Sequence, residues 1–378
     1  MKILLTQHPC AYSPANTDSR QLVGYQKMME HVPDLDFVFS TSRGALLEQY
    51  LKRQAARVAN RLPALAGLKR ELIFRLGQIS WLGADIDHHR PDVLVSYGQM
   101  GLVDRSVRRV PVFYTGGLMT DDLLRARFGA HGVAEGRARQ LASEGRKLDD
   151  LDIYHSHTNA STELLKYYFP EHAAKFITIP FFIGDLRGIS DEDFHDKWLR
   201  TPRRVVFVGN QARLKRLDVL IRAWTELASS RADAEFIVIS NFADGPVDIP
   251  ANQNITVRQN LSHGAVMGLL RSAHFFFMPS DRDSYGLVFI EAMALGCAIL
   301  CSNMEVQREI VVGNGAGLAC DPTNFFDVID RMRMMLDAKT PEVWAQNGRR
   351  AFDTTFAPAT VAQQYATVWK DLARRKVR

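Results

Sequence analysis

The sequence lacks long apolar runs and paired cysteines. No stretch approaches eighteen consecutive apolar residues, so no membrane-spanning helix is expected. The 378 residues include four cysteines, Cys10, Cys297, Cys301 and Cys320, and none of them belongs to a CxxC pair. This pattern excludes a disulfide framework and favours a reducing compartment, which predicts a cytoplasmic location. The first ten residues, MKILLTQHPC, form too short an apolar run for a signal peptide and predict a first strand.

Motifs of several enzyme classes are also missing. There is no GxSxG, no GxxxxGK[ST] and no GxGxxG after a strand, which argues against a hydrolase, a P-loop ATPase and a dinucleotide-binding enzyme. His155 and His157 alternate along one predicted strand without Cys or Glu at zinc-site spacing, so a structural role is favoured over metal binding. Asp281-x-Asp283 imitates a DxD metal motif and is interpreted as a coincidence. We therefore expect no metal and no cofactor.

Short apolar strands alternate with amphipathic helices along the chain. This alternation predicts parallel sheets of the doubly wound α/β type. The helical patterns between strands include residues 217–230 and 262–273. The predicted strands cover residues 2–6, 92–97, 110–115, 152–157 and 175–180 in a first series, and 204–209, 235–240, 255–259, 274–280 and 298–302 in a second.

The two series of strands predict two domains, as the length of the chain also does. The polar segment 184–204 separates the series and is interpreted as a linker. We expect a Rossmann-like domain over residues 1–183 and a second over 200–357, facing each other across a cleft. The last helix, 358–378, is expected to pack back on the first domain. Ligands of such sheets bind beyond the carboxyl ends of the strands.

One acid inside an apolar helix is the strongest single signal. In PSDRDSYGLVFIEAMALG (279–296) a turn delivers the backbone amides of Tyr285, Gly286 and Leu287 at a helix N-terminus, which suits a phosphate. Asp283 could accept hydrogen bonds from sugar hydroxyls, and Glu291 could accept two hydroxyls of a ribose. The alternatives are that Asp283 caps the helix and that Glu291 points to solvent.

A basic loop follows the first strand of the second series. In VVFVGNQARLKRLDVLI (205–221) the strand ends at Gly209, and Arg213, Lys215 and Arg216 precede the next helix. Basic side chains beside a strand end suit a diphosphate. The alternative is an ordinary solvated basic loop.

These segments together resemble the nucleotide-sugar domain of the GT-B glycosyltransferases, in particular the retaining glycosyltransferase family 4. In that family a glutamate, seven residues and a second glutamate precede a small-residue helix ending in glycine, and Asp283-x7-Glu291 matches this arrangement. Lys215 falls on the family's lysine position in the basic loop. The segment 255–280 resembles the one whose first loop touches the base.

The resemblance implies a GT-B fold and an enzyme that moves a sugar from a nucleoside-diphosphate sugar to a glycan, lipid-linked or small-molecule acceptor, with retention. It implies that Asp283 and Lys215 are catalytic and that no metal is required. The implied donor-binding residues are Gly209, Asn210, Arg213, Lys215, Arg258, Gln259, Asp283, Ser284, Tyr285, Gly286, Leu287 and Glu291.

The sequence departs from the family pattern at several positions. Asp283 stands where the family has glutamate, and Asn210 stands where it has arginine, so that Arg213 is the alternative source of this charge. No glycine pair follows the first strand, and Phe181-Phe182 replaces an Asn-Gly turn. The family's N-domain histidine falls on residues 115–117, which are Thr-Gly-Gly. Two alternatives therefore stay open, namely a catalytically impaired nucleotide-sugar-binding subunit and a sugar-nucleotide epimerase of the same fold.

The positive charge is concentrated in the first domain. Residues 43–75 hold eight basic residues against two acidic ones, an excess greater than the net charge of +5 of the whole chain. Within residues 44–82 leucines recur at helical spacing beside a row formed by Arg53, Arg57 and Arg61. A basic amphipathic helix of this kind can lie on anionic lipid at the inner face of a membrane, or can be a core-facing helix with a solvated basic face. No nucleic-acid partner is expected.

Overall fold

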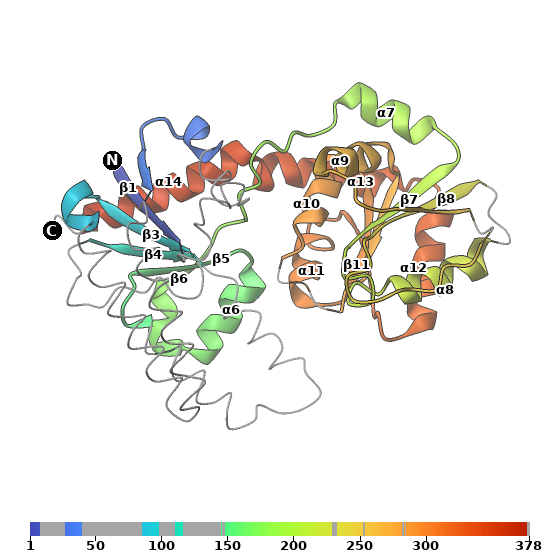
Figure 1. The fold of residues 1–378 in the computed structure, drawn as a ribbon, viewed down its shortest axis with the longest axis horizontal. Coiled ribbons are helices and arrows are strands. Elements are labelled where there is room, and N and C mark those ends of the chain that lie inside the picture. The colour runs from blue at the N-terminus through green and yellow to red at the C-terminus, as the bar shows by residue number, and fades with distance from the viewer. Residues whose placement is uncertain are drawn as a thin grey trace. The chain divides into compact units, whose positions relative to one another are not determined.

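The computed structural model describes residues 1–7, 27–39, 85–97, 110–115, 145, 148–228, 233–251, 254–281, 283 and 285–375. The chain divides into two compact units, each built on one parallel sheet with helices (Figure 1). The first unit contains residues 1–157, 161–184 and 361–378, and the second contains 158–160 and 185–360. This architecture confirms the two-domain, doubly wound α/β fold class that the alternating strands and helices predict.

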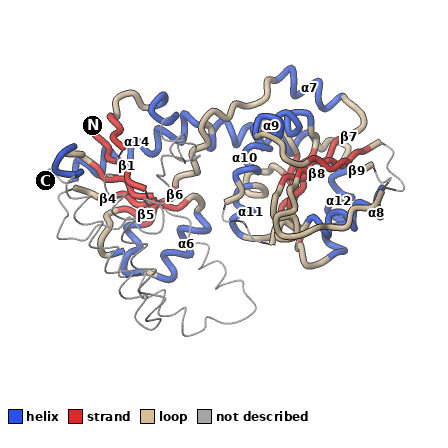
Figure 2. Tube along the Cα trace, viewed as in Figure 1, coloured by secondary structure: helices blue, strands red, loops and turns tan. Residues whose placement is uncertain are grey.

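The first unit has the strand order β2-β1-β3-β4-β5-β6, with every pair parallel. Figure 2 shows the strands of this unit in red, gathered in one sheet. Its elements are β1 (Lys2–Gln7), β2 (Asp36–Phe39), β3 (Val93–Tyr97), β4 (Val112–Thr115), β5 (Ile153–Ser156), α6 (Asn159–Tyr168), the 3₁₀ helix η5 (Pro170–Lys175), β6 (Phe176–Thr178) and α14 (Pro358–Arg375).

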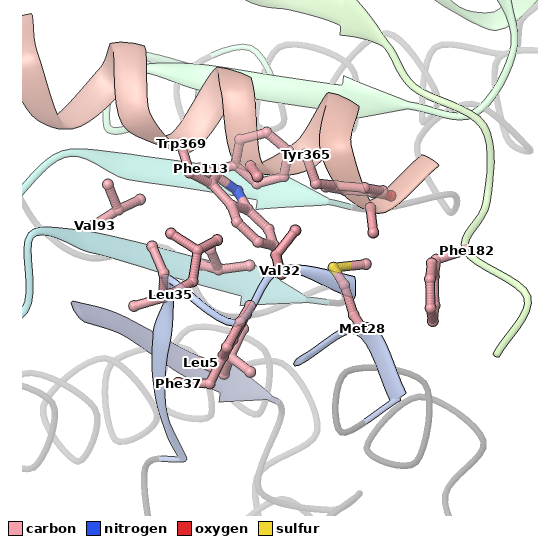
Figure 3. Close-up of a cluster of buried hydrophobic side chains, with 14 of the residues drawn as sticks. Leu5, Met28, Val32, Leu35, Phe37, Val93, Phe113, Phe182, Tyr365 and Trp369 are labelled. Atoms are coloured by element: carbon pink, nitrogen blue, oxygen red, sulfur yellow. The ribbon is translucent and has the colours of Figure 1, made fainter. Parts of the chain in front are cut away.

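The C-terminal helix completes the core of the first unit. Along α14 the buried side chains of Val361, Tyr365 and Trp369 recur every four residues and form one apolar stripe. The Trp369 ring meets the rings of Phe37 and Phe113 edge-on, each at a centroid distance of 5.8 Å (Figure 3). Burial of this stripe against the sheet therefore ties the end of the chain to its first strands.

The second unit has the strand order β12-β11-β10-β7-β8-β9, again with every pair parallel. The order reverses between β7 and β10, so the loops after these two strands flank the crevice where doubly wound sheets bind ligands. Its elements are α7 (Asp191–Leu199), β7 (Arg203–Val208), α8 (Leu217–Ala228), β8 (Ala234–Ile239), β9 (Ile255–Arg258), α9 (His263–Ser272), β10 (Phe275–Met278), α10 (Leu287–Ala294), β11 (Ala298–Ser302), α11 (Glu305–Ile310), β12 (Gly317–Cys320), α12 (Phe325–Asp337), α13 (Glu342–Ala351) and the π-helical turn η6 (Phe352–Phe356).

The ten predicted strands all lie at positions that form strands in the two sheets, whereas β2 and β12 were not predicted. Both are four residues long, and both lie at a sheet edge. The sequence of β12, GLAC, contains a glycine and no β-branched residue, so its local propensity for a strand is weak. Pairing with β11 is what makes these residues extended.

The polar segment interpreted as a linker contains a helix. Ser190 caps α7 by accepting a hydrogen bond from the Asp193 amide at 3.1 Å, and the first turn carries three acids that favour the positive end of the helix dipole. Phe194 is buried, and Trp198 packs with its ring centroid 5.2 Å from that of His274. Two aromatic anchors in an otherwise polar stretch thus attach residues 185–204 to the second unit.

A buried lysine from α7 forms hydrogen bonds with the carbonyls at the C-terminal end of α10. Lys197 is 2% exposed, and its Nζ donates to the carbonyl oxygens of Leu295 at 2.7 Å and Gly296 at 2.6 Å. Gly296 ends the helix with φ +70°, as its sequence position predicts. Burial lowers the pKa of Lys197 to about 8. Carbonyls at a helix C-terminus attract a cation, so this contact holds α10 at the end opposite its N-terminal amides.

A second buried group, His274, makes the stability of the second unit sensitive to acid. Its Nδ1 accepts a hydrogen bond from the Arg204 amide at 2.9 Å and its Nε2 donates to the Lys197 carbonyl at 2.8 Å, so the ring is neutral. Burial lowers the pKa of His274 to about 4.

Because the unfolded chain takes up this proton near pH 6.5, stability should fall between pH 6.5 and 4. We expect the advantage of the wild type over His274→Gln in free energy of unfolding to shrink by about 3 kcal/mol from pH 7 to pH 4. Urea denaturation at each pH measures it. An advantage that does not change with pH would mean that the histidine titrates normally.

Candidate active site

The loop after β7 brings a lysine over the end of its own strand. Gly209 follows β7, and its amide donates to the Ile239 carbonyl at 3.0 Å. A Cβ at this position would lie 2.9 Å from Cγ of Lys215, so a larger residue would displace the lysine side chain. Glycine at position 209 therefore allows Lys215 to lie across the carboxyl edge of the sheet.

An ion pair joins the loops that follow β7 and β10, on either side of the switch point, the place where the strand order reverses. Lys215 Nζ donates to Asp283 Oδ2, and the two side chains are only 18% and 15% exposed. The partners are 68 residues apart in sequence and meet because β7 and β10 are neighbours. Asp283 Oδ1 also accepts from the Tyr285 amide at 3.3 Å. The pair places one cation and one carboxylate where ligands of such sheets bind.

Gly286, and not Asp283, is the N-cap of α10. Its φ is +78°, and a Cβ there would lie 2.5 Å from Cδ2 of Phe289, so the turn requires glycine. The helix begins at Leu287 after the buried Tyr285, and its first amides and positive dipole end lie in the same loop as Asp283. This geometry removes the interpretation of Asp283 as the helix cap. Ser284 lies outside the described residues.

Glu291 points to a partner and not simply to solvent. It is the one charged residue of α10, and its side chain is 12% exposed. His263, the first residue of α9, places Nε2 at 2.8 Å from Glu291 Oε1. This histidine was not among the predicted site residues, because nothing in the sequence between the two positions indicates that α9 and α10 meet.

The side chains of two predicted donor-binding residues form hydrogen bonds with the loop after β8. The Arg213 guanidinium donates to the Pro246 carbonyl at 2.9 Å from Nη2, and Asn210 Oδ1 accepts from the Asn241 amide at 3.2 Å. Both side chains belong to exposed residues. These hydrogen bonds support the neighbouring loop. Among the residues that the structure describes, Lys215 is the one predicted basic residue that contacts Asp283.

Arg258 and Gln259 lie farther along the same edge of the sheet. Arg258 ends β9, which is separated from β7 by β8, and both residues are exposed. Because all strands are parallel, the ends of β7, β8, β9 and β10 share one edge. The structure thus collects the predicted residues on the carboxyl edge of one sheet, with Lys215 and Asp283 in contact.

A buried glutamine beneath the site was not predicted. Gln307 is fully buried, and its Oε1 accepts from the amide of Ser302 at 2.9 Å and from its hydroxyl at 2.8 Å. Its Nε2 donates to the Ser280 carbonyl at 3.5 Å. These contacts connect the strand ends of β10 and β11 below the loop that carries Asp283. Satisfied buried networks of this kind hold a loop in one conformation.

The two acids of the DxD-like pair form ion pairs with different cations. Asp281 accepts from Arg216 at 3.1 Å, while Asp283 pairs with Lys215, so the two acids of the DxD-like pair have different partners. Among the described residues, no group of three or more His, Cys, Asp or Glu side chains could hold a metal ion. The described part of the chain also contains no helix long and apolar enough to cross a membrane.

In the first unit, the described residues near the expected histidine position form a buried polar cluster. Thr115 Oγ1 lies 2.9 Å from Nδ1 of His155, whose Nε2 lies 2.6 Å from the Ile179 carbonyl. Burial lowers the pKa of His155 well below its usual value, so this ring is neutral at pH 7. Gly116, Gly117 and the basic stretch 44–82 lie outside the described residues.

One family model matches the sequence, within the second unit. Residues 190–351 match the model of the family described as glycosyl transferases group 1. The N-acetyl-alpha-D-glucosaminyl L-malate synthase of Bacillus anthracis is 21% identical over 45% of this chain and 46% of its own length. The D-inositol 3-phosphate glycosyltransferase of Paenarthrobacter aurescens is 25% identical over 53% and 50%. The aligned region thus spans about half the length of these relatives.

Solved structures match over almost the whole chain. The sucrose-phosphate synthase of Thermosynechococcus elongatus has a TM-score of 0.65 at 14% identity and covers 98% of both chains. The Anabaena protein Alr3699/HepE, solved in complex with UDP and glucose, has a TM-score of 0.60 at 14% identity over 98% of this chain and 100% of its own. The chain therefore has the GT-B fold of solved glycosyltransferases, and its second unit matches the group 1 glycosyl transferases over residues 190–351.

Proposed function

We propose that this protein is a retaining glycosyltransferase of family 4 that moves a sugar from a nucleoside-diphosphate sugar to an acceptor. The observation that carries the proposal is the Lys215–Asp283 ion pair at the switch point of the second sheet, next to the N-terminus of α10. A cation and a set of helix amides at one strand edge match the diphosphate of such a donor, and the carboxylate matches its sugar hydroxyls.

The leaving diphosphate is the group that this site must stabilise. When the bond from the sugar to the diphosphate breaks, negative charge develops on the phosphate oxygens. Lys215 has three donor hydrogens on Nζ, so it can bind phosphate while it keeps Asp283 as a partner. The amides at Tyr285, Gly286 and Leu287 add the positive end of α10. In this proposal the protein's own groups neutralise the charge and no metal is required.

The remaining residues recognise the two ends of the donor. Asp283 accepts hydrogen bonds from the transferred sugar, and Glu291 accepts the ribose hydroxyls. Gly209 and Asn210 border the diphosphate, while Arg258 and Gln259 lie on the side of the base. Arg213 acts by holding the loop after β8 against the site, which is consistent with its hydrogen bonds to Pro246.

The names of related proteins support this donor class and a lipid-linked acceptor. One relative is named GDP-mannose:cellobiosyl-diphosphopolyprenol alpha-mannosyltransferase, and another phosphatidyl-myo-inositol mannosyltransferase. A membrane-bound acceptor would also give the basic stretch 44–82 a role at the cytoplasmic face of a membrane. The free, buried thiols of Cys297, Cys301 and Cys320 fit a reducing compartment.

Nucleotide binding to the wild type and to Glu291→Ala tests the proposal. Calorimetry against UDP, GDP and ADP should find one that binds. Glu291→Ala should weaken that binding by about 1–3 kcal/mol, roughly 5- to 150-fold, because ribose hydroxyls lose a buried acceptor. The exposed Glu192 on α7 provides the matched control, since Glu192→Ala should bind as the wild type does.

Failure of all three nucleotides to bind would overturn the proposed function. If one nucleotide binds, hydrolysis of the corresponding nucleotide sugar distinguishes a transferase from an impaired binding subunit. Analysis of the anomer of the transferred sugar tests retention and excludes an epimerase.

A further inference from the structure

The contact between His263 and Glu291 joins two helices at the ribose end of the proposed site. His263 Nε2 lies 2.8 Å from Glu291 Oε1, and no other partner of this carboxylate is recorded among the described residues. An ionised carboxylate can only accept hydrogen bonds, so Nε2 carries the hydrogen. The glutamate is 12% exposed and the histidine 56% exposed, which places the contact at the border between the apolar helix and water.

The contact leaves hydrogen-bond acceptor positions on the same carboxylate for a ligand. A carboxylate has about four acceptor positions, and His263 occupies one of them on Oε1. Two vicinal hydroxyls of a ribose need two, so the nucleotide can bind without displacing the histidine. The histidine therefore does not compete with the ribose but fixes the orientation of the group that would bind it.

The position of His263 is itself fixed by the backbone. Ser262 is the N-cap of α9, and its Oγ accepts from the Ala265 amide at 3.3 Å. His263 is the first residue of the helix, where its side chain can reach α10. A glutamate side chain has three rotatable bonds, and without a partner it loses this freedom only when a ligand binds. A partner in place beforehand removes part of that cost.

We propose that His263 is a positioning residue that holds Glu291 for the ribose and so makes the site selective for ribonucleotides over their 2′-deoxy forms. This inference rests on the proposed function, because it assigns a second residue to the ribose that Glu291 binds. It predicts that His263 matters more when both ribose hydroxyls are present than when only the 3′-hydroxyl remains. A residue that merely stabilised α9 would affect both forms of the nucleotide alike.

The experiment measures dissociation constants for one matched pair of probes. The probe is whichever of UDP, GDP and ADP binds the wild type most tightly, together with its 2′-deoxy form. The proteins are the wild type, His263→Ala, His263→Gln, Glu291→Gln and the double variant His263→Ala/Glu291→Gln. His195 on α7, which is exposed, provides the control variant His195→Ala.

The wild type should bind the ribonucleotide at least tenfold more tightly than the deoxy form. His263→Ala should weaken binding of the ribonucleotide at least fivefold and should weaken binding of the deoxy form, which keeps the 3′-hydroxyl, by a clearly smaller factor. His263→Gln should recover most of the loss, because its amide nitrogen can donate to the same oxygen. The double variant should bind no more weakly than Glu291→Gln, since the two residues act through one contact.

Three results would overturn the inference while leaving the proposed function intact. These are an equal loss for both probes, no loss for either in His263→Ala, and additive losses in the double variant. Binding of inorganic pyrophosphate, which should need Lys215 but not His263, checks that each variant keeps an intact second unit. Absence of binding to all three nucleotides would instead overturn the proposed function, and this inference with it.

Discussion

Replacing Lys215 by alanine should weaken binding of the nucleoside diphosphate by about 3 kcal/mol, roughly 150-fold, and reduce transfer at least as much. In the proposed function, the substitution removes the cation that binds the diphosphate. It also leaves Asp283, which is only 15% exposed, without its partner and close to the phosphate charge. The loss therefore combines a missing attraction with a new repulsion, which makes it the largest effect that we expect for binding.

This account of Lys215 can be checked with the bare nucleoside. A nucleoside without phosphates should bind the wild type and Lys215→Ala equally, because the proposal places the lysine at the phosphates and not at the ribose or base. Adding Asp283→Asn to Lys215→Ala should restore part of the lost affinity, since it removes the repulsive charge. Lys166 on α6, paired with Glu163 at 2.8 Å, provides a control substitution outside the second unit. Equal losses for nucleoside and nucleoside diphosphate would place Lys215 outside the diphosphate site.

In contrast to Lys215→Ala, replacing Asp283 by asparagine should mainly reduce turnover and should hardly change binding of the nucleoside diphosphate. We expect turnover to fall about a hundredfold, which is about 2.7 kcal/mol of transition-state stabilisation. In the proposed function, the carboxylate orients the sugar through its hydroxyls, and its charge favours the positive charge that develops on the sugar as the diphosphate leaves. Binding of the nucleoside diphosphate should be unchanged or slightly tighter, because the positive charge of Lys215 is no longer partly neutralised by a neighbouring carboxylate.

Steady-state kinetics with the identified donor measure this difference. A fall in kcat with an unchanged dissociation constant for the nucleoside diphosphate fits a residue that contacts the sugar. Unchanged turnover would show that Asp283 serves only the turn before α10, where it accepts from the Tyr285 amide. Asp281, paired with Arg216, is the matched control in the same loop, and Asp281→Asn should keep normal turnover.

Much of the fold followed from local sequence patterns. The alternation of apolar strands with amphipathic helices predicts two doubly wound sheets, and the end of α10 at Gly296 follows from glycine's freedom at positive φ. The stretch from Asp283 to Glu291 also indicates a helix N-terminus suited to phosphate. These features depend on residues within about a dozen positions of each other, which is the range over which periodicity and turn residues act.

The tertiary structure alone decided which of these elements meet. Lys215 contacts Asp283 because β7 and β10 are neighbours at the point where the strand order reverses, and strand order is not encoded in any local pattern. His263 reaches Glu291 because α9 and α10, the helices before and after β10 in the sequence, pack against each other, and no local pattern fixes that contact. Residues 185–204 belong to the second unit because the buried Phe194 and the partly buried Trp198 pack there, although the segment itself is polar. Local composition determines the elements, whereas burial and sheet order, which depend on the whole chain, determine the partners.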